Sequence, residues 1–240
     1  MAKQQYHNKV LSWIERKRFL LLLMATLLTM VLPAFAGGGR LSELIFVITL
    51  SFLFIQSTIV ADVGKSKKNP IRIIVISMIL IIWLKPAGYD SIYIDLVKQS
   101  FIVAFFIFVM AFLVRFISRS GSVTVDVLIA SINIYLLAGI AGASLSMALN
   151  AVYPGAYNFP AYIEHPAMVN FLYYSFITMS TVGYGDITPR IPETQTLAYI
   201  LSVAGQLYVA IIIAFLIGKF LMYNEEKKPG EEKDSKGLKP

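Results

Sequence analysis

Cysteine is absent from this 240-residue chain, and charged residues make up only 15% of it. Without cysteine there is no disulfide framework, no cysteine-based metal site and no thiol nucleophile. Soluble domains usually carry about 25% charged residues and about 45–50% apolar ones, whereas 57% of this chain is apolar. The composition therefore excludes an ordinary soluble protein. It also excludes a disordered chain, which would be poor in aliphatic and aromatic residues.

Motifs of enzymatic chemistry are also missing. The segment Gly64-Lys65-Ser66 resembles the end of a phosphate-binding loop, but Ile59 stands where that loop requires glycine. The two histidines, His7 and His165, lie far apart in the sequence, and neither belongs to a His-Glu-x-x-His zinc motif. We therefore expect neither an enzyme nor a cofactor.

Long apolar stretches predict an all-α membrane protein. A spanning helix needs about 20 residues, and six stretches come close to or exceed that length, the third being the shortest. A seventh stretch, residues 167–180, would cross only about half of the hydrocarbon at ~1.5 Å per residue and predicts a re-entrant helix. The six predicted spans are residues 19–36, 41–61, 71–84, 91–116, 124–149 and 195–223.

The positions of lysine and arginine predict the orientation of these spans. Seventeen of the 21 basic residues fall in the terminal segments and in alternate loops, and four fall in the remaining loops. Because cytoplasmic loops are enriched in lysine and arginine, we expect a multi-pass protein of the cell membrane with both termini in the cytoplasm. Its charge of +7 then reflects topology and lipid contact, not nucleic acid binding.

The N-terminal segment allows a second interpretation. A basic start, an apolar run from Phe19 and the small residues Ala34-Phe35-Ala36 are typical of a cleaved signal peptide. Pro33 and the three glycines from Gly37 also form a plain outer turn. We expect the segment to be retained, and cleavage would leave the other five spans unchanged.

A glycine-containing segment follows the predicted re-entrant helix and reads Thr181-Val182-Gly183-Tyr184-Gly185-Asp186. A dehydrated cation at membrane depth needs a cage of oxygens, which backbone carbonyls supply when they all turn to one side of an extended chain. Gly183 and Gly185 tolerate the positive φ angles that this geometry requires. Irregular backbone at such depth occurs only where it lines a pore or is buried in protein.

These six residues resemble the selectivity-filter signature of the potassium channel family, and the resemblance extends over residues 124–223. It implies that the carbonyls of Thr181, Val182, Gly183 and Tyr184, with the Thr181 hydroxyl, bind K⁺. Because the chain holds one copy of the motif, a closed ring implies a homotetramer. The expected function is passive K⁺-selective conduction, with K⁺ as the transported ion and no further cofactor. No regulatory subunit is identified.

Residues next to this segment are expected to support it. Tyr173 and Tyr174 occupy positions where the family often has tryptophan or another large aromatic residue, so their hydroxyls can bond to the filter backbone or to Asp186. Ordinary aromatic packing is the alternative. Gly185 and Asp186 complete the motif at the outer mouth, where Asp186 either concentrates cations or acts as a hydrogen-bonded brace.

The sixth span is expected to line the pore. Gly205 lies 22 residues after Gly183, where the family commonly has a gating-hinge glycine; close helix packing is the alternative. Residues 209–211 replace the Pro-x-Pro bend of many voltage-gated members. The apolar run 211–216 is either a dewetting constriction or a surface facing lipid or a neighbouring subunit.

The fourth predicted span argues against a voltage sensor, although a six-span chain resembles the voltage-gated superfamily in outline. Each charge that crosses the field contributes ~2.3 kcal/mol per 100 mV, yet no charge lies between Lys98 and Arg115. We therefore expect no strong voltage gating. The predicted division is a cytoplasmic segment (1–18), a peripheral four-helix bundle (19–120), a pore domain (121–223) and a disordered cytoplasmic tail (224–240).

Polar and small residues inside the spans predict helix contacts. The patterns Gly139 with Ala143 and Ala138 with Gly142 indicate a close helix neighbour in span five. Asp95 is expected either to lie at the membrane interface or to pair with a nearby basic residue. Interhelical hydrogen bonds of ~0.6–2 kcal/mol are expected at the deeper polar residues, which are Gln56, Asn133 and Gln206. A secondary transporter and a non-conducting channel subunit remain as alternative functions.

Overall fold

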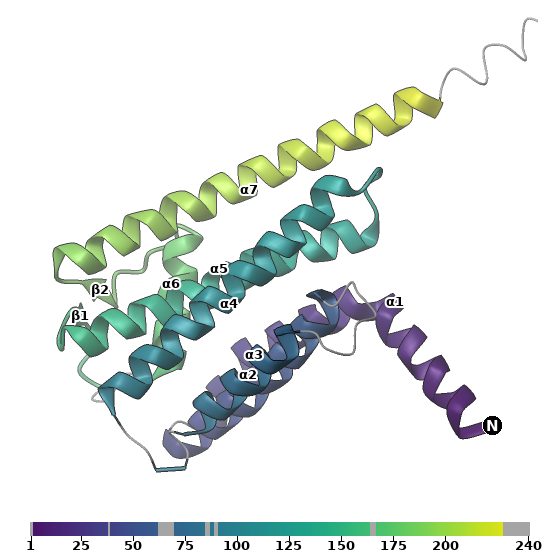
Figure 1. Cartoon of the computed structure of the whole chain (residues 1–240). Coiled ribbons are helices and arrows are strands. Elements are labelled where there is room, and N and C mark those ends of the chain that lie inside the picture. The colour runs from purple at the N-terminus through teal and green to yellow at the C-terminus, as the bar shows by residue number, and fades with distance from the viewer. Residues whose placement is uncertain are drawn as a thin grey trace, which may run out of the picture.

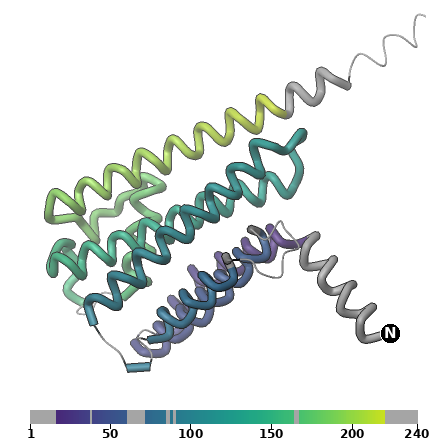
Figure 2. Tube along the Cα trace, viewed as in Figure 1, coloured from purple at the N-terminus to yellow at the C-terminus, as the bar shows by residue number. Residues whose placement is uncertain are grey.

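The structure is a computed structural model, and its described residues are almost entirely helical (Figure 1). It describes the backbone of residues 2–37, 39–61, 70–84, 87–88, 91–163 and 167–227. Side chains are described within residues 17–60, 72–163 and 167–219, with the same gaps. Figure 2 draws the remaining residues in grey. The elements are α1 (Ala2–Val31), the 3-10 helix η1 (Leu32–Ala36), α2 (Gly39–Ala61), α3 (Pro70–Trp83), α4 (Ile92–Arg119), α5 (Val125–Val152), β1 (Tyr157–Asn158), α6 (Met168–Met179), β2 (Thr188–Pro189) and α7 (Pro192–Lys227).

Five of the described helices are long and apolar enough to cross a membrane, namely those within Lys17–Ala36, Gly39–Val60, Ile92–Arg119, Val125–Val152 and Pro192–Lys219. The all-α membrane fold predicted from the sequence is therefore confirmed. The third predicted span is the exception in length. At ~1.5 Å per residue the 14 residues of α3 cover only ~21 Å, less than the ~30 Å hydrocarbon core.

Local sequence explains where several helices begin and end. Proline stands at the first position of α3 and of α7, where its missing N–H costs nothing. Thr124 caps α5, because its hydroxyl oxygen accepts a hydrogen bond from the Val127 amide at 3.4 Å. Pro33 opens the turn after α1, and Gly37 closes it with a left-handed φ of +74°.

Helix α5 is the central element of the fold. It packs against α4, α1, α6 and α7, and 67% of its span is buried inside the chain. Figure 1 shows α4 and α5 between α7 on one side and the group α1–α3 on the other. Asn133 of α5 is fully buried and donates to the Phe19 carbonyl of α1 at 3.2 Å. The predicted interhelical hydrogen bond at Asn133 is therefore confirmed.

Aromatic side chains pack between α1, α2 and α4. The rings of Phe54, Phe105 and Phe106 lie 5.0–6.0 Å apart and join α2 to α4. Phe19 of α1 stacks on Phe116 of α4 at 4.5 Å. Ring pairs at these separations contribute beyond their buried area, so these aromatic contacts help to hold α1 and α2 against α4.

Helix α7 is continuous from Pro192 to Lys227 and is the least buried of the spanning helices, at 11%. It therefore has no break at Gly205 or at residues 209–211. Residues 224–227 extend this helix, although the sequence predicts the disordered tail to start there. The rest of that predicted tail, residues 228–240, lies outside the described residues, as do Glu164 and His165.

Candidate functional site

The site begins with α6, the short helix that matches the predicted re-entrant segment. It has 12 residues and ends at Met179. Its first turn is closed by Asn170, whose side-chain oxygen accepts from the Ala167 amide at 2.9 Å. Its last carbonyls are bonded by the departing chain, since the Ser180 amide donates to the Phe176 carbonyl at 2.9 Å. The helix is therefore complete at both ends, and the chain leaves it directly into the glycine-containing segment.

Small residues of α5 let α6 approach closely. A Cβ atom added to Gly139 would lie 2.3 Å from the Phe176 ring, and one added to Gly142 would lie 2.6 Å from the Ser175 hydroxyl. The Ser175 hydroxyl donates to the Gly139 carbonyl at 2.7 Å. The close helix contact predicted from the small-residue pattern is therefore confirmed, and its partners are α6 and, through Leu201 beside Gly142, α7.

An aromatic cluster holds the other side of α6. Tyr157, which belongs to β1, packs edge-on against Phe171 and Tyr174 with ring centres 5.8 and 5.1 Å apart. Tyr174 is only 2% exposed, and its hydroxyl has no hydrogen-bond partner within the described part of the chain. Of the two alternatives for Tyr174, the structure therefore favours aromatic packing over a bond to the following segment.

Tyr173 faces the opposite way and contacts Asp186. Its hydroxyl donates to the Asp186 carboxylate at 2.6 Å, and the other carboxylate oxygen accepts from the Ile187 amide at 3.1 Å. The hydrogen bond to Asp186 raises the pKa of Tyr173 to about 12, so the hydroxyl stays protonated and able to donate at neutral pH. The pair links the middle of α6 to the far end of the glycine-containing segment.

The backbone between the end of α6 and Asp186 alternates between positive and negative φ angles. Thr181, Gly183 and Gly185 have positive φ angles of 61°, 50° and 80°, whereas Val182 and Tyr184 do not. The positive φ predicted for both glycines is therefore observed, while that of Thr181 is not foreseen from the sequence. The Gly183 amide points back to α6 and donates to the Ile177 carbonyl at 3.1 Å.

The carbonyls of this segment are left available. Within the described residues, those of Thr181, Val182, Gly183 and Tyr184 accept no hydrogen bond. Val182 and Tyr184 are 52% and 73% exposed in the single chain. Inside a membrane such free carbonyls would need other partners, because lipid supplies none.

Helix α7 contacts the start of the segment through two neighbouring residues. The Gln206 side-chain amide donates to the Thr181 hydroxyl at 3.2 Å, and that hydroxyl donates to the Ser180 carbonyl at 2.7 Å. At Gly205 an added Cβ would lie 2.0 Å from the Met179 carbonyl oxygen. Gly205 therefore lies in a close helix contact, and no hinge is visible there. Sequence reasoning noted Gln206 as polar but did not connect it with Thr181.

The outer end of the segment is tied to the end of α5. Strands β1 and β2 pair antiparallel, with Tyr157 opposite Pro189 and Asn158 opposite Thr188. The Ala156 carbonyl accepts from the Arg190 amide at 2.9 Å and from the Thr194 hydroxyl at 3.1 Å. The chain is thus fixed on both sides of Thr181–Asp186, by α6 before it and by this strand pair after it.

Metal-ligating side chains do not gather anywhere in the described residues, where no group of three histidine, cysteine or acidic residues is found. The arrangement instead offers backbone oxygens on an irregular segment that stands at the end of a half-length helix. This combination defines the class of the protein as an all-α membrane protein in which a short helix is followed by an irregular loop.

Comparison with known proteins agrees with this class. The family model Ion_trans_2, described as "Ion channel", matches residues 101–222, which is just over half of the chain. The chain therefore belongs to this ion channel family. A human protein named potassium voltage-gated channel subfamily A member 10 is 29% identical over 63 residues.

That human relative is covered only in small part. The match spans 26% of this chain and 12% of the relative. No solved structure is significantly similar to the chain. The resemblance of the chain to a potassium channel family is confirmed by these two matches.

Proposed function

We propose that this chain is one subunit of a homotetrameric, K⁺-selective channel of the cell membrane, with both termini in the cytoplasm. The observation that carries the proposal is the segment Thr181–Tyr184, whose carbonyls accept no hydrogen bond in the described chain. Rings of backbone carbonyls replace the hydration shell of K⁺ in channels. The four carbonyls of each subunit, with the Thr181 hydroxyl, would form such rings.

The exposed surface of α7 supports the tetramer. Only 11% of its span is buried in the single chain. In the proposed channel this helix would line the pore and contact neighbouring subunits. Large apolar side chains are exposed along its length, among them Tyr199, Val203, Leu207 and Ile211. One loop supplies a quarter of a ring, and cyclic symmetry places four copies of it on one axis. Neighbouring subunits would then cover α7 and the side chain of Tyr184.

The direction of α6 adds to the attraction for cations. Its carboxyl end leads into Thr181, so the partial negative charge of the helix dipole lies at the inner end of the proposed filter. In this arrangement residues 121–223 form the pore domain and residues 19–120 a peripheral bundle. Conduction is passive and involves no covalent step, so the chain acts as a channel and not as an enzyme.

The proposal is tested by flux from the purified protein alone in liposomes. We expect rapid K⁺ flux that strongly exceeds Na⁺ flux and an assembly mass of four subunits. Slow, saturable transport coupled to a second ion would indicate a transporter. Absence of flux without a partner would indicate a non-conducting subunit. Either result would contradict the proposal.

A further inference from the structure

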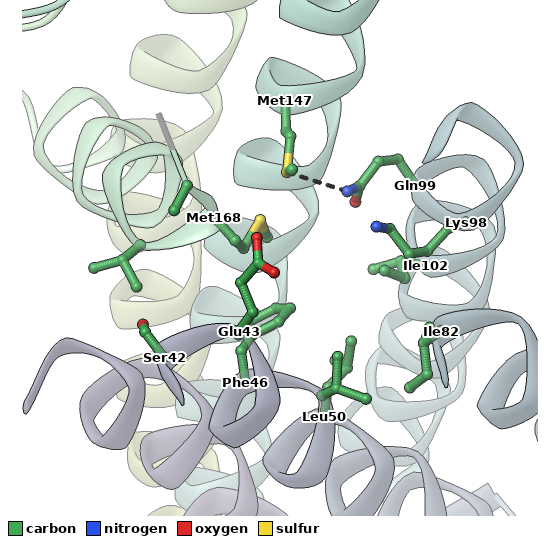
Figure 3. Close-up of a pocket in the computed structure, with 13 residues that line it drawn as sticks. Ser42, Glu43, Phe46, Leu50, Ile82, Lys98, Gln99, Ile102, Met147 and Met168 are labelled. Atoms are coloured by element: carbon green, nitrogen blue, oxygen red, sulfur yellow. Dashed lines mark hydrogen bonds between the residues drawn. The ribbon is translucent and has the colours of Figure 1, made fainter. Parts of the chain in front are cut away.

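A crevice separates the peripheral helices from the first turn of α6 (Figure 3). Five helices, α2 to α6, contribute to its wall, and it holds about 590 Å³ including its open mouth. It lies outside the proposed filter, since none of the residues 181–186 lines it.

Gln99 of α4 gives the crevice an unpaired acceptor. The side chain is only 3% exposed, and its amide nitrogen donates to the Met147 sulfur at 3.2 Å. The amide oxygen has no hydrogen-bond partner among the described residues. A thioether is a weak acceptor, and a buried carbonyl oxygen without a donor is unfavourable. The Gln99 amide oxygen is therefore available to a donor on a bound molecule.

The remaining wall carries the polar side chains of Ser42, Glu43 and Lys98 and is apolar elsewhere. Figure 3 shows Glu43 of α2 directed toward Met168, across the same space from Gln99 and Lys98. Lys98 is already ion-paired with Asp95 on its own helix. Phe46, Leu50 and Ile82 provide an apolar floor. The crevice thus combines carboxylate and amide oxygens with a surface for a hydrocarbon chain.

We propose that this crevice binds an amphipathic molecule with a primary ammonium head. The head donates hydrogen bonds to the Gln99 amide oxygen and the Glu43 carboxylate, and the alkyl chain lies on Phe46 and Leu50. An aminophospholipid of the membrane and a soluble alkylamine offer the same chemistry. A quaternary ammonium carries the same charge but has no N–H, so it leaves the Gln99 oxygen unpaired.

Occupancy would also touch the helix that precedes the proposed filter. Met168 and Val169 of the first turn of α6 line the crevice, and the other end of that helix leads into Thr181. A bound molecule therefore contacts the peripheral bundle and α6 at once. The binding itself does not depend on K⁺ conduction, so its failure and the failure of the proposed function are separate results.

The test measures calorimetric binding of two probes, octylammonium and octyltrimethylammonium, to the full-length protein in phosphatidylcholine nanodiscs. We expect octylammonium to bind about tenfold more tightly, because only it donates to the buried oxygen. The variant Gln99→Met keeps the side-chain length and removes the amide acceptor but leaves Glu43, so it should markedly reduce the preference. Empty nanodiscs give the background of partition into lipid.

Gln56→Met is the matched control. Gln56 is also buried, at 8% exposure, and its amide oxygen also lacks a partner in the described chain, but it does not line the crevice. This variant should keep the wild-type preference. Equal affinity for the two probes, a preference that is undiminished in Gln99→Met, or no saturable binding would each overturn the proposal.

A second arm identifies the source of the ammonium group. Phosphatidylethanolamine has a primary ammonium, and phosphatidylcholine has a quaternary one. If the lipid is the occupant, adding phosphatidylethanolamine to the nanodiscs should weaken octylammonium binding to wild type and should have a smaller effect in Gln99→Met. Unchanged octylammonium binding to wild type would assign the site to a soluble amine.

Discussion

The side-chain amide of Gln206 lies 3.2 Å from the Thr181 hydroxyl and donates a hydrogen bond to it. This contact joins the middle of α7 to the first residue of the proposed filter. The next residue toward the N-terminus, Gly205, lies against the Met179 carbonyl at the end of α6. A displacement of α7 in this region therefore acts directly on the segment that would hold the ion.

The variant Gln206→Leu is expected to weaken the innermost ion site. Leucine keeps the bulk of the side chain and removes the donor, so the Thr181 hydroxyl loses its partner from α7. We expect the ratio of K⁺ to Na⁺ flux in liposomes to fall several-fold. Gln195→Leu, the same change at an exposed position near the start of α7, should leave the ratio unchanged. An unaltered ratio in Gln206→Leu would show that the contact does not influence selectivity.

The variant Gly205→Ala distinguishes close packing from a hinge. The added Cβ would lie 2.0 Å from the Met179 carbonyl oxygen, and such overpacking typically costs ~1–3 kcal/mol. We expect a lower midpoint of thermal unfolding and reduced flux.

Gly218→Ala is the control for Gly205→Ala on the same helix. Nothing lies within 4 Å of a Cβ added at Gly218. Alanine there should be neutral or stabilise α7 by up to ~1 kcal/mol through helix propensity. If Gly205→Ala changed the opening of the channel but left the unfolding midpoint intact, the hinge would be the better explanation.

Two adjacent tyrosines permit a test of the proposal that the hydrogen bond between Tyr173 and Asp186 supports the filter. Tyr173→Phe removes the 2.6 Å hydrogen bond to Asp186, so the proposed filter should lose conduction faster during sustained K⁺ flux. Tyr174→Phe removes a hydroxyl without a partner in the described structure and should behave as wild type. Single-channel recording of both variants measures the difference. Equal stability of conduction in wild type and Tyr173→Phe would contradict the brace.

The features that follow from local sequence were predictable, and those that depend on how helices meet were not. Residues 167–180 were expected as a short helix and form α6 from Met168 to Met179, because the length of an apolar run is a local property. The positive φ of Thr181 is different, since most side chains disfavour that region. The residues around Thr181 in the sequence do not indicate this backbone conformation.

The roles of neighbouring residues show the same limit. Tyr173 and Tyr174 have identical side chains, yet one bonds Asp186 and the other is buried against Tyr157. The face of α6 that each occupies depends on its packing against α5, where Gly139 sets the distance. The spacing from Gly183 likewise singled out Gly205. It could not distinguish a hinge from a helix contact, because that distinction depends on the position of Met179.

Weak voltage dependence is expected from α4. No charged residue lies on this helix between Lys98 and Arg115, and Lys98 is ion-paired with Asp95. With ~2.3 kcal/mol per charge per 100 mV, a helix without internal charges supplies little energy for opening. Conductance measured across ~100 mV should change only slightly. Arg115→Gln and Arg119→Gln should leave that curve unaltered; a steep curve that these variants abolish would show that α4 senses voltage.

The most direct test of the proposed filter is Gly183→Ala. Gly183 has a φ of +50° and nothing within 4 Å of an added Cβ, so in the single chain the substitution acts through the backbone. An L-residue pays ~1–2 kcal/mol in this left-handed region, and the strain should turn the neighbouring carbonyls away from the ion. We expect K⁺ flux to be lost, or to fall to the level of Na⁺ flux.

Gly155→Ala is the matched control for this variant. Gly155 also has a positive φ, of +80°, and an equally open surrounding, but it lies in the turn before β1 and outside the proposed filter. The two substitutions therefore impose a comparable backbone strain at different places. If both variants kept wild-type K⁺ preference, residues 181–184 would not be the filter. If both lost it to the same extent, the loss would reflect general destabilisation. Loss in Gly183→Ala alone, with equal unfolding midpoints, assigns selectivity to the segment that contains Gly183.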